Sequence, residues 1–281
     1  MTNSITITPS GQACGAEITG VDLTSPLEPD QVKAIRDAWL EHHVVSFPDQ
    51  HLSDDDLERF ATYFGDFGDD PFFGPIPGRE HIAAIRREAN DTSPIFAESF
   101  HSDWSFMENP PIATVLFGLD IPPEGGDTFF VNQHKALAEM PEDLKSRLSG
   151  RTAVHSARFA YSPEGAYGKE ENIGSMDIRP SEEAYKQHSH ELLRAHPETG
   201  EPGIFGAPFA YIVGIEGMPD EDAHALVAEM HNWQIQDQFI YQHKWQKDML
   251  VMWDNRSVLH RASGGYEGHR RELHRVTVYG N

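Results

Sequence analysis

The chain has 281 residues, of which 38% are hydrophobic and 10% aromatic. This is enough apolar material for a buried core, which excludes an intrinsically disordered protein. Acidic residues outnumber basic residues 45 to 22, so the net charge is −23 at pH 7. Such a charge repels phosphate backbones and anionic lipids, and neither nucleic acid nor a membrane is an expected partner. The single cysteine, Cys14, excludes an intrachain disulfide and a cysteine-based zinc site.

Neither the start of the chain nor its interior carries a membrane or export signal. The first eight residues contain no basic residue, and no apolar run approaches the roughly 20 residues of a transmembrane helix. We therefore expect a cytoplasmic protein. No internal repeat, low-complexity tract or Gly/Ser linker divides the sequence, so we expect one domain spanning residues 1–281.

The predicted elements begin with two helices. Apolar residues recur at helical spacing over residues 29–43, and Ser53 is a typical N-cap for a second helix that ends near Gly65. Later helices are expected over residues 181–194 and 220–231. Short runs rich in β-branched and aromatic residues predict strands. They lie at residues 44–47, 82–85, 113–117, 128–131, 152–159, 250–253 and 273–279.

Short strands separated by long insertions indicate a mainly β fold with helices, a β-sandwich or jelly roll. The strands do not alternate regularly with helices, which argues against a doubly wound parallel sheet. Residues 160–200 are polar and punctuated by proline and glycine, so we expect a lid-like insertion there. His188 and His190 fall in the predicted 181–194 helix, where residues two apart point in different directions, and we expect both to be exposed.

Three residues could hold a metal ion. His101 and Asp103 are two positions apart, and if residues 100–106 are extended, their side chains share one face with Cα atoms roughly 6.6 Å apart. Together with His260 they would supply two imidazoles and one carboxylate, the ligand set of non-heme Fe(II) oxygenases. A lone His-x-Asp pair more often belongs to a surface or a satisfied core, so the pair alone does not establish a site.

Two arginines near the C-terminus could bind anions. If the predicted strand 273–279 is extended back to residue 271, Arg271 and Arg275 lie on one face of it, with Cα atoms roughly 13 Å apart. His274 should then face the other way. Guanidinium groups bind carboxylates through two parallel hydrogen bonds and stay charged when buried. Thr128, after a Gly-Gly-Asp turn, could add a hydrogen bond to an anion on Arg271. Two surface arginines in salt bridges are the alternative.

Five segments, in this order, resemble the taurine dioxygenase family of Fe(II)/2-oxoglutarate-dependent oxygenases, which also contains the 2,4-dichlorophenoxyacetate dioxygenases. They are residues 7–23, 100–106 (FHSDWSF), 122–128 (PPEGGDT), 253–261 (WDNRSVLHR) and 270–275 (RRELHR). The segments run from near the first residue to near the last. The resemblance implies a double-stranded β-helix (jelly roll) core and an assembly of two or four chains.

The resemblance also implies roles for the candidate residues. His101, Asp103 and His260 would be the catalytic metal ligands that hold Fe(II). Thr128 and Arg271 would bind the distal carboxylate of 2-oxoglutarate, whose other end chelates the metal. The implied reaction uses O2 to oxidise a substrate C–H bond while 2-oxoglutarate becomes succinate and CO2. If the oxidised carbon also bears oxygen, sulfur or nitrogen, the hydroxylated product can collapse and cleave that bond.

The remaining implied roles concern the substrate. Trp253 would pack beside the metal centre, and Arg275 would bind the anionic group of the substrate. Taurine dioxygenase offers a histidine and a tyrosine to its sulfonate in a loop that here contains Asp70, which makes taurine a poor substrate. Asp70 would face solvent or meet a cation, and Phe73 and Phe159 would suit an aryl or alkyl body. We therefore expect a small organic anion, a carboxylate with an apolar body.

Three alternatives stay open from the sequence. The first is a dioxygenase for taurine or another alkylsulfonate or sulfate. The second is a cupin-like metal enzyme that does not use 2-oxoglutarate, and the third is a non-catalytic metal-binding protein. The last two leave the Thr128 and Arg271 segments unexplained.

Overall fold

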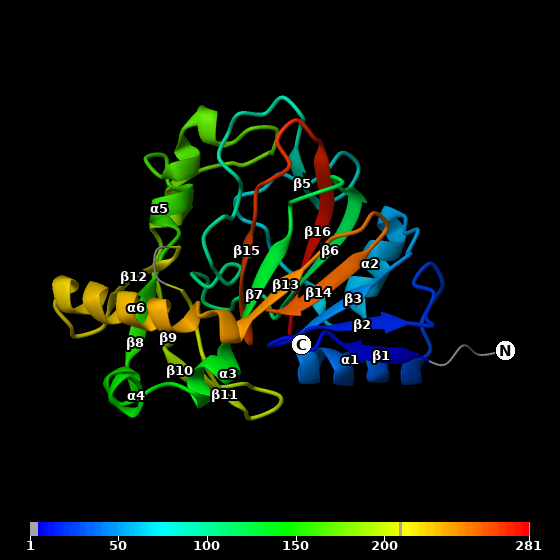
Figure 1. Ribbon diagram of the computed structural model, residues 1–281. Coiled ribbons are helices and arrows are strands. Elements are labelled where there is room, and N and C mark those ends of the chain that lie inside the picture. Colours follow the sequence, from blue (N-terminus) through cyan, green and yellow to red (C-terminus); the bar gives the residue numbers. More distant parts are fainter. Residues whose placement is uncertain (1–4, 208–209, 281) are drawn as a thin grey trace.

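A computed structural model describes residues 5–207 and 210–280 of the chain (Figure 1). The predicted domain of residues 1–281 therefore extends beyond the described residues at positions 1–4, 208–209 and 281. Among the described residues, no helix has the length and apolar character needed to cross a membrane. The chain is mainly β with helices, as predicted.

The largest sheet has eight strands and joins the two ends of the chain. β5 (Ala83–Arg87) pairs with β16 beside the main path of the sheet. That path runs in the order β1 (Thr6–Pro9), β2 (Ala16–Thr19), β3 (Val44–Phe47), β14 (Leu250–Asp254), β6 (Ala113–Asp120), β16 (Arg271–Tyr279) and β4 (Asp66–Phe67). The C-terminal strand β16 thus lies between β6 and β5 (Figure 1). Alternate residues at its start, Arg271, Leu273 and Arg275, are buried.

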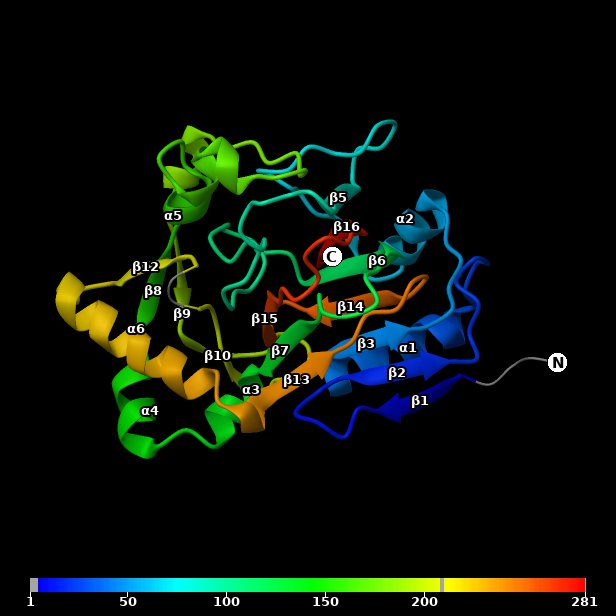
Figure 2. The same cartoon turned by 45° about the horizontal axis from the view of Figure 1, so that its top comes forward.

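A second, three-stranded sheet lies beside the first in both views (Figures 1 and 2). It consists of β13 (Ile240–His243), β7 (Thr128–Asn132) and β15 (Val258–Ala262). A buried apolar cluster joins the two sheets, with Phe130 and Val258 from the smaller sheet and Val251, Trp253 and Leu273 from the larger. This cluster sets β7, β15 and β16 against one another, which positions the site described below.

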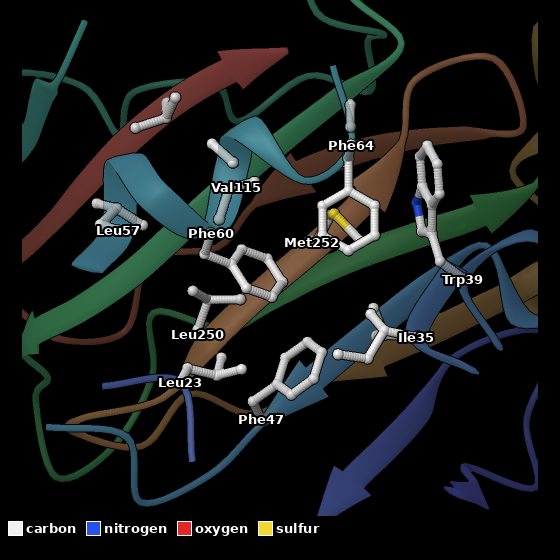
Figure 3. Packing of buried hydrophobic residues seen from close by; sticks show 14 of the residues in the cluster. Leu23, Ile35, Trp39, Phe47, Leu57, Phe60, Phe64, Val115, Leu250 and Met252 are labelled. Atoms are coloured by element: carbon white, nitrogen blue, oxygen red, sulfur yellow. The ribbon is translucent and has the colours of Figure 1, made fainter. Parts of the chain in front are cut away.

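Two helices cover the other face of the large sheet. α1 (Pro29–His42) and α2 (Asp54–Thr62) bury Trp39 and Phe60 against Leu250 and Met252 of β14 (Figure 3). Because side chains alternate along a strand, Leu250 and Met252 face the helices while Val251 and Trp253 face the second sheet. The hydroxyl of Ser53 accepts a hydrogen bond from the backbone N–H of Asp56, so Ser53 is the predicted N-cap.

The remaining elements form a flank beside the second sheet (Figure 2). A second large apolar cluster lies between the helices and strands of this flank and includes Leu144, Ala153, Ile212 and Met230. The helices are α3 (Gln133–Ala138), α4 (Glu142–Leu148), α5 (Arg158–Tyr161) and α6 (Asp220–Gln234), with 3₁₀ turns at Ala166–Gly168, Glu170–Asn172, Glu182–Tyr185 and Asp237–Phe239. The strands are β8 (Thr152–His155), β9 (His188–Glu191), β10 (Leu193–Ala195), β11 (Pro202–Ile204) and β12 (Ile212–Ile215).

Three local predictions are wrong. Residues 181–194 form a 3₁₀ turn and two strands instead of a helix, because alternate residues of β9 are half-buried against β8. The predicted exposure of His188 and His190 is wrong for the same reason, since both lie on the half-buried face of β9. The His190 imidazole lies 2.8 Å from the carbonyl of Met107. The predicted strand at 152–159 ends at His155, where residues 158–161 turn into α5.

Candidate metal centre

Two histidines meet because their backbones pair. The N–H of His101 donates to the carbonyl of His260 at 3.0 Å, and the N–H of His260 donates back at 2.8 Å. The two imidazole centroids are 4.2 Å apart. His260 belongs to β15, so this bridge attaches residue 101 to the smaller sheet.

Asp103 completes the group through a turn, not an extended segment. Residues 103–106 form turns, and Trp104 adopts a left-handed φ of 48°, so the predicted extension of residues 100–106 is wrong beyond His101. The carboxylate nevertheless converges on the histidines. Its Oδ1 lies 3.4 Å from Nε2 of His101 and 3.5 Å from Nε2 of His260. The three residues sequence analysis selected therefore lie together, and all three are buried.

The donor set fits a divalent first-row metal. Ligand atoms about 2.1 Å from such an ion lie roughly 3.0–3.4 Å from one another, close to the observed separations. Nδ1 of His101 lies 2.9 Å from the carbonyl of Ser99 and can donate to it, which leaves Nε2 with its lone pair. Burial lowers the pKa of His260 to about 3, so this imidazole is neutral. Burial alone would raise the pKa of Asp103, but the nearby His260 and His101 hold it below its ordinary value.

A chain of hydrogen bonds orients the Asp103 carboxylate. The hydroxyl of Thr114, on β6, donates to Asp103 Oδ2 at 2.6 Å. The side-chain amide of Asn255 donates to the same hydroxyl oxygen at 2.9 Å, and the indole N–H of Trp253 donates to Asn255 Oδ1 at 2.9 Å. Sequence analysis missed Thr114 and Asn255. Asn255 lies inside the segment 253–261, one of the five that resemble the family, and could have been found there. Nothing in the sequence around Thr114 indicates a role near the metal, apart from its position in a predicted strand.

A cavity adjoins the three residues. Trp253, Thr128, Arg271 and Arg275 line it together with the metal-binding group. The imidazole of His260 packs against Trp253, with ring centroids 4.6 Å apart. Two further segments, remote in sequence, also line the cavity. They contribute Ser93, Pro94, Phe96 and Ala97, and Ile173 with Met176. Part of the polar 160–200 segment therefore contributes to the lining of the site.

Arg271 is a buried cation without a counter-ion. Its side chain is 6% exposed, and no acidic group within the described ranges lies at ion-pair distance from it. One nitrogen donates to the carbonyl of Gly126 at 3.1 Å, while Nε has no partner among the described residues. The nearby Thr128 hydroxyl accepts the indole N–H of Trp245 at 2.9 Å and keeps its own proton to donate. The pair can thus bind a carboxylate.

Arg275 differs from Arg271 because its guanidinium already forms an ion pair with an acidic side chain. Both carboxylate oxygens of Asp70 lie on Nη2 of Arg275, at 2.6 and 2.5 Å. The guanidinium is 4.4 Å from the ring centre of Phe73 and 5.1 Å from that of Trp104. Asp70 therefore meets a cation, one of the two outcomes expected from the sequence. His274, between the arginines, faces the other way and contacts Asp54 of α2.

The two predicted aromatic substrate contacts have different surroundings. Phe73 is buried beneath Arg275 and does not itself line the cavity. Phe159 is 51% exposed on α5 beside Arg158, outside the cavity, so the structure does not support its predicted contact with substrate. Several apolar lining residues were not predicted, among them Ile85, Phe96, Leu116 and Met176.

A second group of possible metal ligands consists of His43, His134 and Glu201. Its chemistry fits a metal less well, because both ring nitrogens of His134 are engaged. Nδ1 lies 2.9 Å from the carbonyl of Pro202, and Nε2 lies 2.9 Å from the hydroxyl of Ser257. We make no proposal for this group.

Comparison with known proteins decides the family. The family model described as "Taurine catabolism dioxygenase TauD, TfdA family" matches residues 6–277, nearly the whole chain. The chain belongs to this family. As a TauD/TfdA protein it is an Fe(II)- and 2-oxoglutarate-dependent dioxygenase, an oxidoreductase that also uses O2. A cupin-like enzyme without 2-oxoglutarate and a non-catalytic protein are therefore not favoured.

Individual relatives resemble this TauD/TfdA protein over most of their length. An alkylsulfatase of Acinetobacter baylyi is 31% identical over 95% of this chain and 82% of its own. The alpha-ketoglutarate-dependent 2,4-dichlorophenoxyacetate dioxygenase of Cupriavidus pinatubonensis is 30% identical over 98% of both chains. A crystal structure of a taurine dioxygenase homologue from Burkholderia xenovorans superposes with a TM-score of 0.81 at 29% identity and covers 99% of this chain and 93% of its own.

Proposed function

We propose that this dioxygenase oxidises a C–H bond of a small organic acid whose body is an apolar aryl or alkyl group. The reaction is a hydroxylation, and it continues to bond cleavage where the oxidised carbon also bears oxygen, sulfur or nitrogen. Relatives named for 2,4-dichlorophenoxyacetate and (S)-phenoxypropionate support this substrate class. The apolar lining residues Ile85, Phe96, Leu116 and Met176 would contact the body of the acid.

One observation carries the proposal: the Arg271 guanidinium, which is buried and has no counter-ion among the described residues, lies beside the metal-binding group. An unpaired buried charge is costly, so Arg271 is expected to gain an anionic partner. In our assignment that partner is the distal carboxylate of 2-oxoglutarate, which Arg271 and the Thr128 hydroxyl hold. His101, Asp103 and His260 hold Fe(II), which supplies the oxidising chemistry with O2 when bound.

The other residues position groups around this centre. Trp253 packs on His260 and, through Asn255 and Thr114, orients Asp103. Arg275, on the same strand as Arg271, is assigned to the acid group of the substrate. Ile173 and Met176 from the 160–200 segment would exclude water once the ligands are bound.

We further propose that residues 1–281 form one domain with a double-stranded β-helix core, in which the two facing sheets described above are the strand layers. The relatives and solved structures match nearly the whole chain, which supports a single unit. A homodimer or homotetramer in the cytoplasm, with no nucleic acid or membrane partner, remains our expectation from the sequence.

The test is a substrate screen by succinate formation in the presence of Fe(II), 2-oxoglutarate and O2. We expect aryloxy- and alkyl-carboxylic acids to stimulate succinate release, and Arg275→Ala to raise KM for an accepted acid by at least 10-fold with a smaller effect on kcat. A KM unchanged by Arg275→Ala for every acid would contradict the proposal. If only alkyl sulfates or sulfonates stimulate succinate release, the alternative function, a dioxygenase for alkylsulfonates or sulfates, would be favoured. The alkylsulfatase relative is consistent with that alternative.

A further inference from the structure

Asp70 places a negative charge against Arg275, the residue assigned to the acid group of the substrate. It follows β4 in a loop, whereas Arg275 lies on β16, and the two meet through the contacts of 2.6 and 2.5 Å described above. Arg275 is 4% exposed, and Phe73 and Trp104 lie against its guanidinium. Arg275 lines the same cavity as the metal-binding group, so the ion pair holds a carboxylate directly behind that part of the lining.

The pair changes the charge balance of the site. The charges of Fe(II) and the 2-oxoglutarate dianion cancel each other. Asp103 and Asp70 then balance Arg271 and Arg275, so the loaded site is neutral before any substrate enters. A substrate with a single negative charge would leave an uncompensated charge in a buried cavity, which is unfavourable. A substrate with no net charge would not.

Arg275 nevertheless keeps a donor for a substrate carboxylate. Its Nε is buried and has no partner in the described part of the chain, while Asp70 contacts Nη2. A carboxylate bound to Nε would lie close to the carboxylate of Asp70, and the two anions would repel each other. Asp70 retains acceptor positions beyond its contacts to Arg275, so a cationic group on the substrate could bind there and remove the repulsion.

We propose that Asp70 determines substrate specificity at this site, favouring an organic acid that also carries an ammonium group over a simple monoanion. The inference rests on the proposed function, in which the substrate carboxylate binds Arg275, and it narrows the class to amino acids with an apolar body. Asp70 acts by contacting the ammonium group and takes no part in the oxidation. The aryloxy acids named for the relatives lack this group.

The test compares acids that differ only in the amino group. One pair is L-phenylalanine and 3-phenylpropanoate, and the other is L-norleucine and hexanoate. Calorimetric titration into protein loaded anaerobically with Fe(II) and 2-oxoglutarate measures Kd without turnover. We expect the amino member of at least one pair to bind at least 10-fold more tightly, and Asp70→Asn to reverse this order.

Two controls separate the role of Asp70 from a general charge effect. Asp69→Asn removes the same charge from a neighbouring, exposed position and should leave both Kd values within 2-fold. In an Arg275→Ala background, Asp70→Asn should no longer improve binding of the plain acids, because the shared arginine is gone.

Two results would overturn the inference. One is no preference for the amino members in either pair, whether both members bind equally or neither binds. The other is a preference that survives Asp70→Asn. Failure of the protein to bind 2-oxoglutarate at all would instead contradict the proposed function.

Discussion

The Asp103 carboxylate depends on a single hydroxyl for its orientation. Thr114 donates to Oδ2, which leaves Oδ1 directed at the two histidines. Thr114→Val keeps the shape of the side chain but removes this donor. Loss of such supporting hydrogen bonds typically weakens metal affinity by about 10–100-fold.

We therefore expect Thr114→Val to raise the Kd for Fe(II), measured by anaerobic equilibrium titration, within that range. Thr114→Ser restores the hydroxyl and should bind the metal nearly as well as the unmodified chain. Equal affinity of all three proteins would show that the hydrogen bond does not orient the ligand.

At the residue scale, the sequence predicts the metal group but not its surroundings. His101, Asp103 and His260 could be selected because few residue types bind Fe(II) and all three lie in segments that resemble the family. The Thr114 contact joins residues 11 positions apart across a turn with a left-handed Trp104, which no spacing rule anticipates. The Asp70–Arg275 pair joins residues 205 positions apart, and an aspartate in a loop indicates no partner by itself.

At the element scale, the turn before β7 approaches Arg271 closely. Gly126 has a φ of +69°, and a Cβ atom built on it would lie 3.0 Å from Arg271 Nε. Gly126→Ala should displace the guanidinium from the anion it is proposed to bind. The same substitution at Gly150 (φ +67°) meets no atom within 4 Å, so it adds a comparable backbone strain of about 1 kcal/mol without touching the site.

We expect Gly126→Ala to raise KM for 2-oxoglutarate by at least 10-fold, while Gly150→Ala leaves it within 2-fold. The measurement is initial-rate kinetics of succinate formation with 2-oxoglutarate varied. Similar KM values for the two variants would indicate that the turn does not control the position of Arg271.

Elements whose signal lies within their own residues were predicted well, and those whose burial depends on a distant partner were not. The strand Leu250–Asp254 is buried on both faces, and its sequence is a continuous apolar run up to Asp254. Helix α2 carries both its N-cap residue and its stripe of buried apolar residues in its own sequence. Residues 188–191 read His-Ser-His-Glu, a polar run without an apolar stripe. Pairing with β8 makes it a strand, and β8 lies more than 30 positions earlier in the chain.

At the scale of the whole molecule, buried neutral histidines make stability depend on pH. Burial lowers the pKa of His43 and of His243 to about 4 and that of His155 to about 3, whereas in the unfolded chain each should titrate near its ordinary value of 6.5. Below pH 6.5 the unfolded state therefore binds more protons than the folded state. The three neutral, buried histidines therefore make their full contribution to stability above pH 6.5. This contribution is lost as the pH falls from 6.5 toward their folded-state pKa values.

Each of these histidines should lower the free energy of unfolding by about 1.4 kcal/mol per pH unit between pH 6.5 and its folded-state pKa. Urea unfolding of the metal-free protein at pH 7 and pH 5 should therefore differ by several kcal/mol. His155→Phe should reduce this difference by about 2 kcal/mol, because one titrating group is removed. An unfolding free energy that is the same at both pH values would contradict the assigned protonation states.

The central claim is that Arg271 holds 2-oxoglutarate at an Fe(II) site built from His101, Asp103 and His260. Anaerobic titration of the metal-free protein with Fe(II) and then 2-oxoglutarate tests it most directly, through the weak visible charge-transfer band of the chelate. We predict a band in the unmodified chain and in Arg270→Ala, which removes a partly exposed neighbouring arginine, and none in Arg271→Ala at the same concentrations. Bound Fe(II) without a band, or an undiminished band in Arg271→Ala, would contradict this assignment.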